Sequence, residues 1–481
     1  MLEAIKKLGE YETEKEGTEI EDIEKFVEKV PLKNTKKVIC IVFKNNNGDF
    51  VYDHIYIEDY DESKSIKYLY RGTQHKQYNV TPTAKITTVK GEVDIKNIIE
   101  NVKNQLFRWF KTYSNKDSLL LSLKKALEEK QEEIFRDFAS KYQELTKDER
   151  NNSILTIIIQ ENGVNKYIGD IEIFKKIFTE SVEEKFKSRK WGGKKVEAKG
   201  SGICCICREH KEVLGLALPF PFYTVDKRGF APEFTREDAW KRLPICKKCA
   251  EHLMAGKNFL DTYTLKSFYQ GYKFYLIPNF VLGEIDEELI KEIKRQERNK
   301  EYSVEKYSGL LIEDDYILEP IKNRGDSLNL IFMFIQQKQG GFDIAKYVED
   351  VPPSWLNRLS ATLQEVNRLP IFKEETLKKL GIVGKKRSGD LKDIDSTRIG
   401  GLVESFFPKS RETTGIYSKY FIDIVGDILA QKPLNKDLLF SAFMREIRNR
   451  QVNKKDYEEK ILVLKSFMLV LFLKKVNLIK I

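Results

Sequence analysis

The chain has 481 residues, of which 41% are hydrophobic and 33% are charged. This composition excludes a disordered chain and supplies enough apolar material for about two to four folded domains. Lysine and arginine number 84 against 74 acidic residues, a formal charge of +10, which favours a polyanionic partner if the excess is clustered and indicates only a solvated surface if it is spread evenly.

The ends of the sequence predict a protein of the cytoplasm without a membrane segment. Met1–Lys7 shows no secretory signal. The most apolar stretch, Ile461–Ile481, is interrupted by Lys465, Lys474 and Lys475. The uninterrupted run Ser466–Leu473 is too short to cross a bilayer, so the stretch is predicted to be a buried helix.

The first part of the chain is predicted to mix strands and helices. Val38–Phe43 and Phe50–Ile57 are rich in β-branched and aromatic residues and flank an Asn-Gly turn, which is typical of a hairpin. A second strand and turn are expected at Ile154–Ile159 and Asn162-Gly163. Helical spacing follows each strand element, at Ile98–Phe110, Leu119–Leu145 and Ile171–Phe186.

Lys185–Gly202 is a basic segment around Trp191-Gly192-Gly193, and we expect a mobile connector there. Cations beside an aromatic ring suit phosphate neutralisation and base stacking. An extended, solvated linker explains the same residues equally well. A second basic cluster between Arg445 and Lys455 is weaker, since cations near a helix C-terminus are favourable without any ligand.

From about residue 285 onward the sequence predicts helices only, with Gly381–Gly401 as an exposed loop. The expected helical segments are Leu328–Ile335, Trp355–Leu369, Tyr417–Leu429, Leu438–Arg450 and Tyr457–Leu478. The predicted fold class is α+β, with a mixed α/β N-terminal region (1–190), an inserted zinc-ribbon region (191–284) and an all-α C-terminal helical bundle (285–481).

Five of the six cysteines lie between positions 204 and 249. Cys204, Cys207, Cys246 and Cys249 form two C-x-x-C pairs, whose four thiolates would close the coordination sphere of one structural zinc ion. Cys205 can replace Cys204 in this scheme, and His210 or His252 can replace one sulfur, as minor alternatives. Cys40 lies in an apolar strand and is assigned no function.

The sequence shows no recognisable catalytic constellation. It has four histidines, His54, His75, His210 and His252, and lacks the phosphate-loop, zinc-protease and nucleophile-elbow motifs. The acidic group Glu313-Asp314-Asp315 is typical of a solvated turn. We therefore expect a binding protein rather than an enzyme.

The central segment resembles the large subunit of the subtype I-B CRISPR interference complex, or Cascade, of the TM1802/Csh1-like group. The similarity covers about residues 203–280. The residues that carry it are Cys204–Cys207, Pro219–Lys227, Gly229–Pro232, Ala239–Lys241, Pro244–Cys249, Gly256-Lys257 and Tyr275–Pro278.

This resemblance implies a non-enzymatic subunit that contacts the 5′ end of a guide CRISPR RNA, reads a protospacer-adjacent motif in double-stranded target DNA and helps to open it. Its implied partners are the backbone and small subunits of Cascade and a separate helicase-nuclease. We assign nucleic-acid binding to the basic segment and to the tip of the first hairpin, at Lys190, Trp191, Lys194, Lys195, Asn46 and Asn47.

Alternatives remain open at this point. The polymerase-like large subunit of type III CRISPR complexes also carries a zinc ribbon, but here Gly340-Gly341 is followed by Phe342-Asp343, which lacks the paired acidic ligands of a two-metal site. A zinc-ribbon scaffold or unrecognised nucleic-acid enzyme outside CRISPR systems is more distant. Met333 can open an internally translated helical subunit, although a core methionine is the favoured interpretation.

Overall fold

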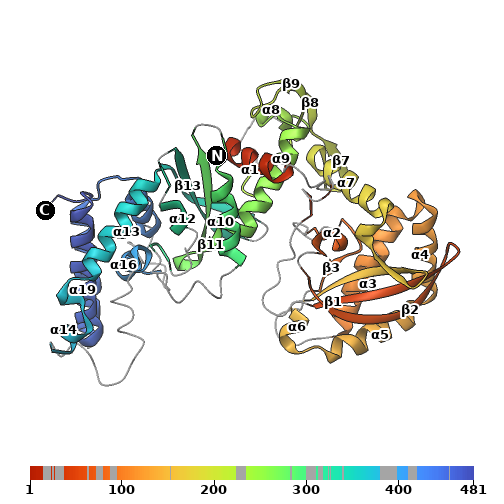
Figure 1. The fold of residues 1–481 in the computed structure, drawn as a ribbon, viewed down its shortest axis with the longest axis horizontal. Coiled ribbons are helices and arrows are strands. Elements are labelled where there is room, and N and C mark those ends of the chain that lie inside the picture. Colours follow the sequence, from red (N-terminus) through yellow and green to blue (C-terminus); the bar gives the residue numbers. More distant parts are fainter. Residues whose placement is uncertain are drawn as a thin grey trace. The chain divides into compact units, whose positions relative to one another are not determined.

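The computed structural model describes residues 1–14, 23, 26–27, 37–61, 64–71, 80–86, 95–151, 153–223, 235–281, 284–298, 310–312, 318–322, 324–325, 327–338, 341–379, 398–409, 420–453 and 456–480 (Figure 1). They form two compact units. One unit is Gly9–Asn258, and the other joins Met1–Leu8 to Phe259–Ile481. Helices α1 (Leu2–Thr13) and α9 (Lys247–Phe259) cross the two boundaries.

A five-stranded sheet forms the centre of the unit Gly9–Asn258 (Figure 1). Its strands are β1 (Lys37–Asn46), β2 (Asp49–Asp59), β3 (Ala84–Lys85), β4 (Ser153–Glu161) and β5 (Val164–Tyr167). Their order is β2-β1-β4-β3, with β5 also pairing with β4, and β1 and β4 run parallel. Because β1 is central, its run Val38–Phe43 is buried on both faces.

Both faces of this sheet are covered. On one face Val38, Cys40 and Val42 pack against a cluster of tyrosines that includes Tyr68 and Tyr167, near the short helix α2 (Ser65–Tyr68). On the other side β2 packs against α4 (Ser118–Glu129) and α5 (Gln131–Glu144), which follow α3 (Ile95–Tyr113). The helical stretch expected at Leu119–Leu145 is confirmed, and it is divided at Lys130 into α4 and α5.

Both predicted Asn-Gly turns are present. Asn47 and Gly48 have φ values of 55° and 99°, and Asn162 and Gly163 have values of 49° and 80°. Positive φ at both central residues is the requirement of a two-residue hairpin turn that matches the twist of its strands, and Asn-Gly meets it best. The two hairpins, β1-β2 and β4-β5, confirm this part of the sequence prediction.

The expected mobile connector at Lys185–Gly202 is wrong. Helix α7 (Glu172–Lys187) runs directly into a hairpin of β6 (Ser188–Trp191) and β7 (Lys194–Glu197), followed by β8 (Lys199–Ile203). Gly192 and Gly193 both adopt positive φ and close this hairpin. The many lysines led to the prediction of a linker, although exposed hairpin strands carry charged residues as readily as linkers do.

The rest of this unit carries the cysteines. It comprises β9 (His210–Leu214), α8 (Ala239–Arg242), β10 (Ile245–Cys246) and the start of α9. Strands β8, β9 and β10 make a three-stranded antiparallel sheet. Backbone bonds from Ala198 to Lys187 and from Leu216 to Phe186 attach this sheet to the end of α7.

The second unit also contains a sheet, so the prediction that residues 285–481 are all helical is wrong. Antiparallel strands β11 (Leu265–Ser267), β12 (Tyr272–Phe280), β13 (Leu328–Lys338) and β14 (Gly341–Val351) lie in that order. The expected helix Leu328–Ile335 is part of β13. Its apolar run satisfies a helix or a doubly buried strand equally well, and pairing with β12 on one side and β14 on the other decides the outcome.

Helices α10 (Glu287–Arg298) and α12 (Leu318–Lys322) lie between β12 and β13 in sequence. After β14 the described chain is helical, which confirms a C-terminal helical region. Gly400 and Gly401 belong to α16, and most of the expected loop Gly381–Gly401 lies outside the described residues. The remaining helices are α13 (Pro353–Asn367), η8 (Pro370–Phe372), α14 (Glu374–Lys379), α16 (Ile399–Phe406), α17 (Phe421–Leu429), α18 (Lys436–Val452) and α19 (Asp456–Lys475).

Met333 is fully buried in β13, as expected for a core methionine. In the described part of the chain, none of the helices combines the length and the apolar character needed to cross a bilayer. The domain boundaries at 190/191 and 284/285 stay predictions.

We expect Phe334→Ala to destabilise the second unit by about 3–5 kcal/mol, because its buried ring in β13 contacts the rings of Phe268, Phe274 and Phe332. Chemical denaturation followed by circular dichroism measures the change. Ile344→Ala on the adjacent strand β14, where the side chain is 39% exposed, is the control and should cost less than about 1 kcal/mol. Equal effects would contradict the assigned core.

Candidate metal centre

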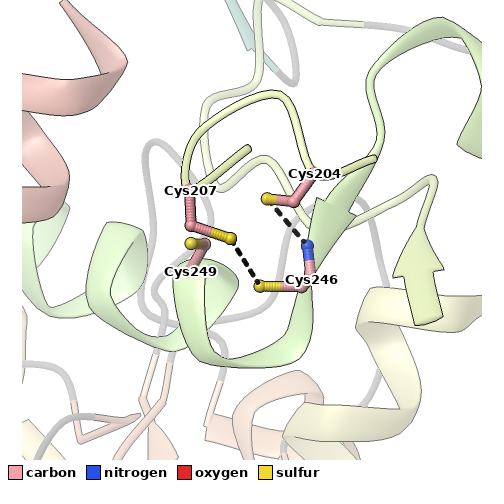
Figure 2. Close-up of side chains that lie close together, drawn as sticks. All are labelled: Cys204, Cys207, Cys246 and Cys249. Atoms are coloured by element: carbon pink, nitrogen blue, oxygen red, sulfur yellow. Dashed lines mark hydrogen bonds between the residues drawn. The ribbon is translucent and has the colours of Figure 1, made fainter. Parts of the chain in front are cut away.

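Four predicted cysteines meet at one point in the unit Gly9–Asn258. The sulfur atoms of Cys204, Cys207, Cys246 and Cys249 all lie within 4.8 Å of one another (Figure 2). The Cys207 and Cys246 sulfurs are 3.8 Å apart. Residues separated by about forty positions in the chain thus form one compact cluster that could hold a metal ion.

The first pair lies in the tight connection between β8 and β9. The Cys204 amide donates to the Glu209 carbonyl, and the Arg208 amide donates to the Cys204 carbonyl, at 2.9 and 3.0 Å. Arg208 has φ of 63°, a left-handed conformation that reverses the chain after Cys207. This turn aims the Cys204 and Cys207 side chains at the same point.

The second pair lies at a strand-to-helix junction. Cys246 ends β10, where it pairs with Val213 of β9, and Cys249 is in the first turn of α9. The position of Cys249 at a helix N-terminus favours the thiolate form, because free backbone N–H groups and the positive end of the helix dipole lie there. The Cys246 amide also donates to the Cys204 sulfur at 3.4 Å (Figure 2).

The two halves of the centre are held together by backbone bonds as well. The Cys205 amide donates to the Pro244 carbonyl at 2.8 Å. The Lys247 ammonium lies 2.9 Å from a Glu183 carboxylate oxygen, which attaches the start of α9 to α7. The cluster is therefore built into the fold rather than carried on a free loop.

The pKa values of the thiols distinguish Cys204 from Cys205. Burial alone would raise the pKa of Cys204, but amides of Cys246, Cys207 and Ile206 oppose burial and lower it to about 7. Burial raises the pKa of Cys205 to about 11, and its sulfur is outside the cluster. Cys204 is thus the better thiolate donor of the two.

Burial also raises the pKa values of Cys246 and Cys249, and the negative charge on Cys204 adds to the effect. Several thiolates in so small a volume repel one another, and a divalent cation would reverse this repulsion. Zinc–sulfur bonds of about 2.3 Å place tetrahedral sulfurs about 3.8 Å apart, which is the separation of Cys207 and Cys246. The donor set fits a four-thiolate metal site.

Neither histidine alternative joins the cluster. His210 is exposed on β9, and His252 is buried in α9, where its Nδ1 atom lies 3.4 Å from Glu10 of α1. The α1 backbone approaches so closely there that a Cβ atom on Gly9 would lie 1.8 Å from the His252 carbonyl oxygen.

Sequence reasoning missed Trp240 as a structural residue of this module. Its indole lies against Gly200 of β8, where an added Cβ would meet the ring at 2.4 Å. A Cβ atom added to Gly215 would likewise lie 2.3 Å from the backbone nitrogen of Trp240. The residues beside Trp240, Ala239 and Lys241, gave no signal that two glycines distant in sequence are needed to accommodate the indole.

The predicted basic residues lie on the β6-β7 hairpin. Lys190 pairs across the strands with Lys195, and Trp191 pairs with Lys194. The Lys195 ammonium is 2.7 Å from Glu184; burial would raise the pKa of Glu184, but Lys195, Ser188 and Lys187 lower it to about 2. Lys190 and Lys194 are exposed, and no ion-pair partner for either occurs among the described residues.

Trp191 packs beside Ala198 and Ala239. The guanidinium groups of Arg189 and Arg236 lie over its ring, 5.7 and 5.2 Å from the centroid. The ring thus has a packing role in the structure, and its stacking on a base stays a prediction.

Asn46 and Asn47 are exposed at the β1-β2 tip, on a different sheet from Lys190 and Lys194. The Asn45 side chain receives a hydrogen bond from the Gly48 amide and donates one to Glu161, both at 2.7 Å. Because Glu161 is the last residue of β4, the two Asn-Gly tips lie side by side. The sequence reasoning did not single out Asn162 as a site residue, although its turn signal was recognised.

We expect Cys204→Ser to remove bound metal, while Cys205→Ser, the matched control at the adjacent residue, retains about one ion per chain. The reason is that only the Cys204 sulfur belongs to the cluster. Elemental analysis of the purified variants measures the metal. Equal metal content in both variants would contradict the assigned donor set.

Comparison with known proteins connects this geometry to a family. Three models of CRISPR-associated protein TM1802 match in succession: the N-terminal domain at residues 1–180, the central domain at 201–351 and the C-terminal domain at 401–481. No curated protein matches the sequence. The central match contains the four-cysteine cluster. The chain therefore belongs to the TM1802 family of CRISPR-associated proteins.

Proposed function

We propose that this chain is the non-catalytic large subunit of a type I-B CRISPR surveillance complex, Cascade, which uses a guide RNA to find target DNA. Its membership of the TM1802 family, in the expected domain order, is the observation that supports this role most directly. In this role it contacts the 5′ end of the guide RNA, recognises a protospacer-adjacent motif and supports opening of the duplex. The backbone and small subunits and a helicase-nuclease are its proposed partners.

The β6-β7 hairpin supports a phosphate contact. Lys190 and Lys194, which have no carboxylate partner in the part of the chain that the structure describes, lie beside the tight turn at Gly192-Gly193. Like charges gathered on a two-stranded ribbon repel one another, and a phosphate would relieve that repulsion. Because Lys195 is already paired with Glu184, we assign the main electrostatic contribution to Lys190 and Lys194.

The paired Asn-Gly tips support base contacts. Two-stranded ribbons are narrow enough to enter the major groove, and asparagine side chains can form paired hydrogen bonds to adenine. The Asn45–Glu161 bond holds the β1-β2 tip against the β4-β5 tip, so Asn46, Asn47 and Asn162 are presented on a stiff support. We assign motif reading to this pair of tips.

Zinc is the metal we propose for the cysteine cluster. Four sulfur ligands leave no open coordination position, so the ion would stabilise the fold and take no part in a reaction. Its task would be to fix β8, β9, β10 and α9 next to the basic hairpin. A subunit without its own chemistry requires a separate enzyme to cut the DNA, in keeping with the helicase-nuclease partner.

We expect the double variant Lys190→Glu/Lys194→Glu to weaken binding to duplex DNA and to lower the dependence of affinity on salt by about one logarithmic unit of slope per lost phosphate contact. The measurement is fluorescence anisotropy at several salt concentrations, with complex assembled from the co-encoded subunits and guide RNA. Lys125→Glu/Lys130→Glu in the exposed α4-α5 region changes the net charge equally and is the control.

Equal losses in the two double variants would show that net charge alone acts, and would remove the hairpin from the DNA-binding surface. Recovery of the chain without guide RNA or partner subunits, after expression together with its co-encoded subunits, would contradict the Cascade role itself.

We expect Asn47→Gly to reduce discrimination between a duplex with the correct motif and one with a scrambled motif by about 1–3 kcal/mol. Glycine accepts the positive φ of position 47, so the turn is retained while the amide is lost. Competition binding with the two duplexes gives the difference. Asn453→Gly, at the C-terminal end of α18, is the control. Unchanged discrimination in Asn47→Gly would exclude this side chain from base reading.

A further inference from the structure

The C-terminal helical region exposes an organised set of apolar side chains. Phe440, Met444 and Ile447 recur at i, i+4 and i+7 on α18, and Val463, Phe467 and Val470 repeat the same spacing on α19. Met444, Val463 and Phe467 are 48%, 46% and 46% exposed. Scattered exposed apolar residues are ordinary, but two matched stripes on neighbouring helices are typical of an interaction surface.

The two stripes line one groove of about 500 Å³. Helices α18 and α19 pack against each other, and Ile371 of η8 contributes to the same lining. Two lining residues are held by ring packing. Phe443 packs on Phe406 with ring centroids 4.3 Å apart, and Phe467 packs on Phe372. A groove between two helices with apolar residues one turn apart has the form that accepts a third amphipathic helix.

The charged residues near the groove indicate which kind of helix can bind there. Exposed cations near the lining residues outnumber the acidic side chains there. The exposed cations are Arg448 on α18, Lys460 and Lys474 on α19, and Lys373 after η8, whereas the acidic residues are the exposed Asp437 and the half-buried Glu459. A helix with acidic residues beside its apolar stripe complements both the lining and the margin.

We propose that this groove binds an amphipathic helix of a partner protein, with apolar anchors at i, i+3 or i+4, and i+7 flanked by aspartate or glutamate. Anchors of this spacing fill a groove lined by Phe440, Met444 and Phe467, and the flanking acids complement the exposed cations Arg448 and Lys460. Nucleic acid fits less well, because the lining residues named for the groove are almost all apolar. The groove shares no residue with the nucleic-acid elements proposed above.

The test uses the full chain assembled with its co-encoded subunits and guide RNA. Val463→p-benzoylphenylalanine places a photo-crosslinker in the groove, and mass spectrometry identifies the crosslinked segment. We expect one partner-protein helix with acidic residues beside its apolar stripe. A synthetic peptide of that segment should bind the isolated full chain, and Met444→Asp/Phe467→Asp or Arg448→Glu/Lys460→Glu should weaken this binding about tenfold or more.

Leu121→Asp, at an exposed apolar position of α4, is the control, and melting temperatures establish that each variant is folded. Crosslinks to RNA, lipid or a second copy of this chain, or none at all, would overturn the proposal. So would peptide binding that both groove variants leave unchanged. Loss of DNA binding in the Lys190 and Lys194 variants would not affect any of these outcomes.

Discussion

The association of four cysteine sulfurs is the contact on which the central part of this protein depends. It joins the β8-β9 turn to the β10-α9 junction, two segments that are otherwise connected by the short pairing of β9 with β10 and by the backbone bond from Cys205 to Pro244. Small sheets of this kind bury little apolar surface, so a metal cross-link would supply stability that packing alone does not. The β6-β7 hairpin and the end of α7 attach to the same module through backbone bonds, so their orientation follows from it.

The two units use their sheets differently. In the unit Gly9–Asn258, a central strand buried on both faces supports two hairpins whose tips remain exposed and polar. In the other unit, β12 and β13 are buried in an aromatic core with Phe268, Phe274 and Phe334, and the helices that follow leave an apolar groove at the surface. We propose that the polar hairpin tips of the first unit recognise nucleic acid and that the apolar groove of the second binds a partner protein.

Local signals in the sequence predicted much of this structure, and interactions distant in sequence account for what was missed. Asn-Gly and Cys-x-x-Cys act over a few residues, so the turns at Asn47 and Asn162 and the cysteine cluster were foreseeable. The run Leu328–Ile335 was assigned to a helix because its strand partners lie elsewhere in the chain. The Asn45–Glu161 bond spans 116 positions, and neither residue type nor spacing indicates it.

The length of chain between the two cysteine pairs affects how readily this module tolerates insertions. Cys207 and Cys246 are joined by the 38 residues Arg208–Ile245, and an ion bound to both ends would turn that segment into a closed ring. The entropy lost on closing a ring rises only with the logarithm of its size, by about 0.6 kcal/mol for each doubling. Segments could therefore be added within Arg208–Ile245, away from its paired strands and from Trp240, at little entropic cost, which makes this the natural place for the module to acquire new surface.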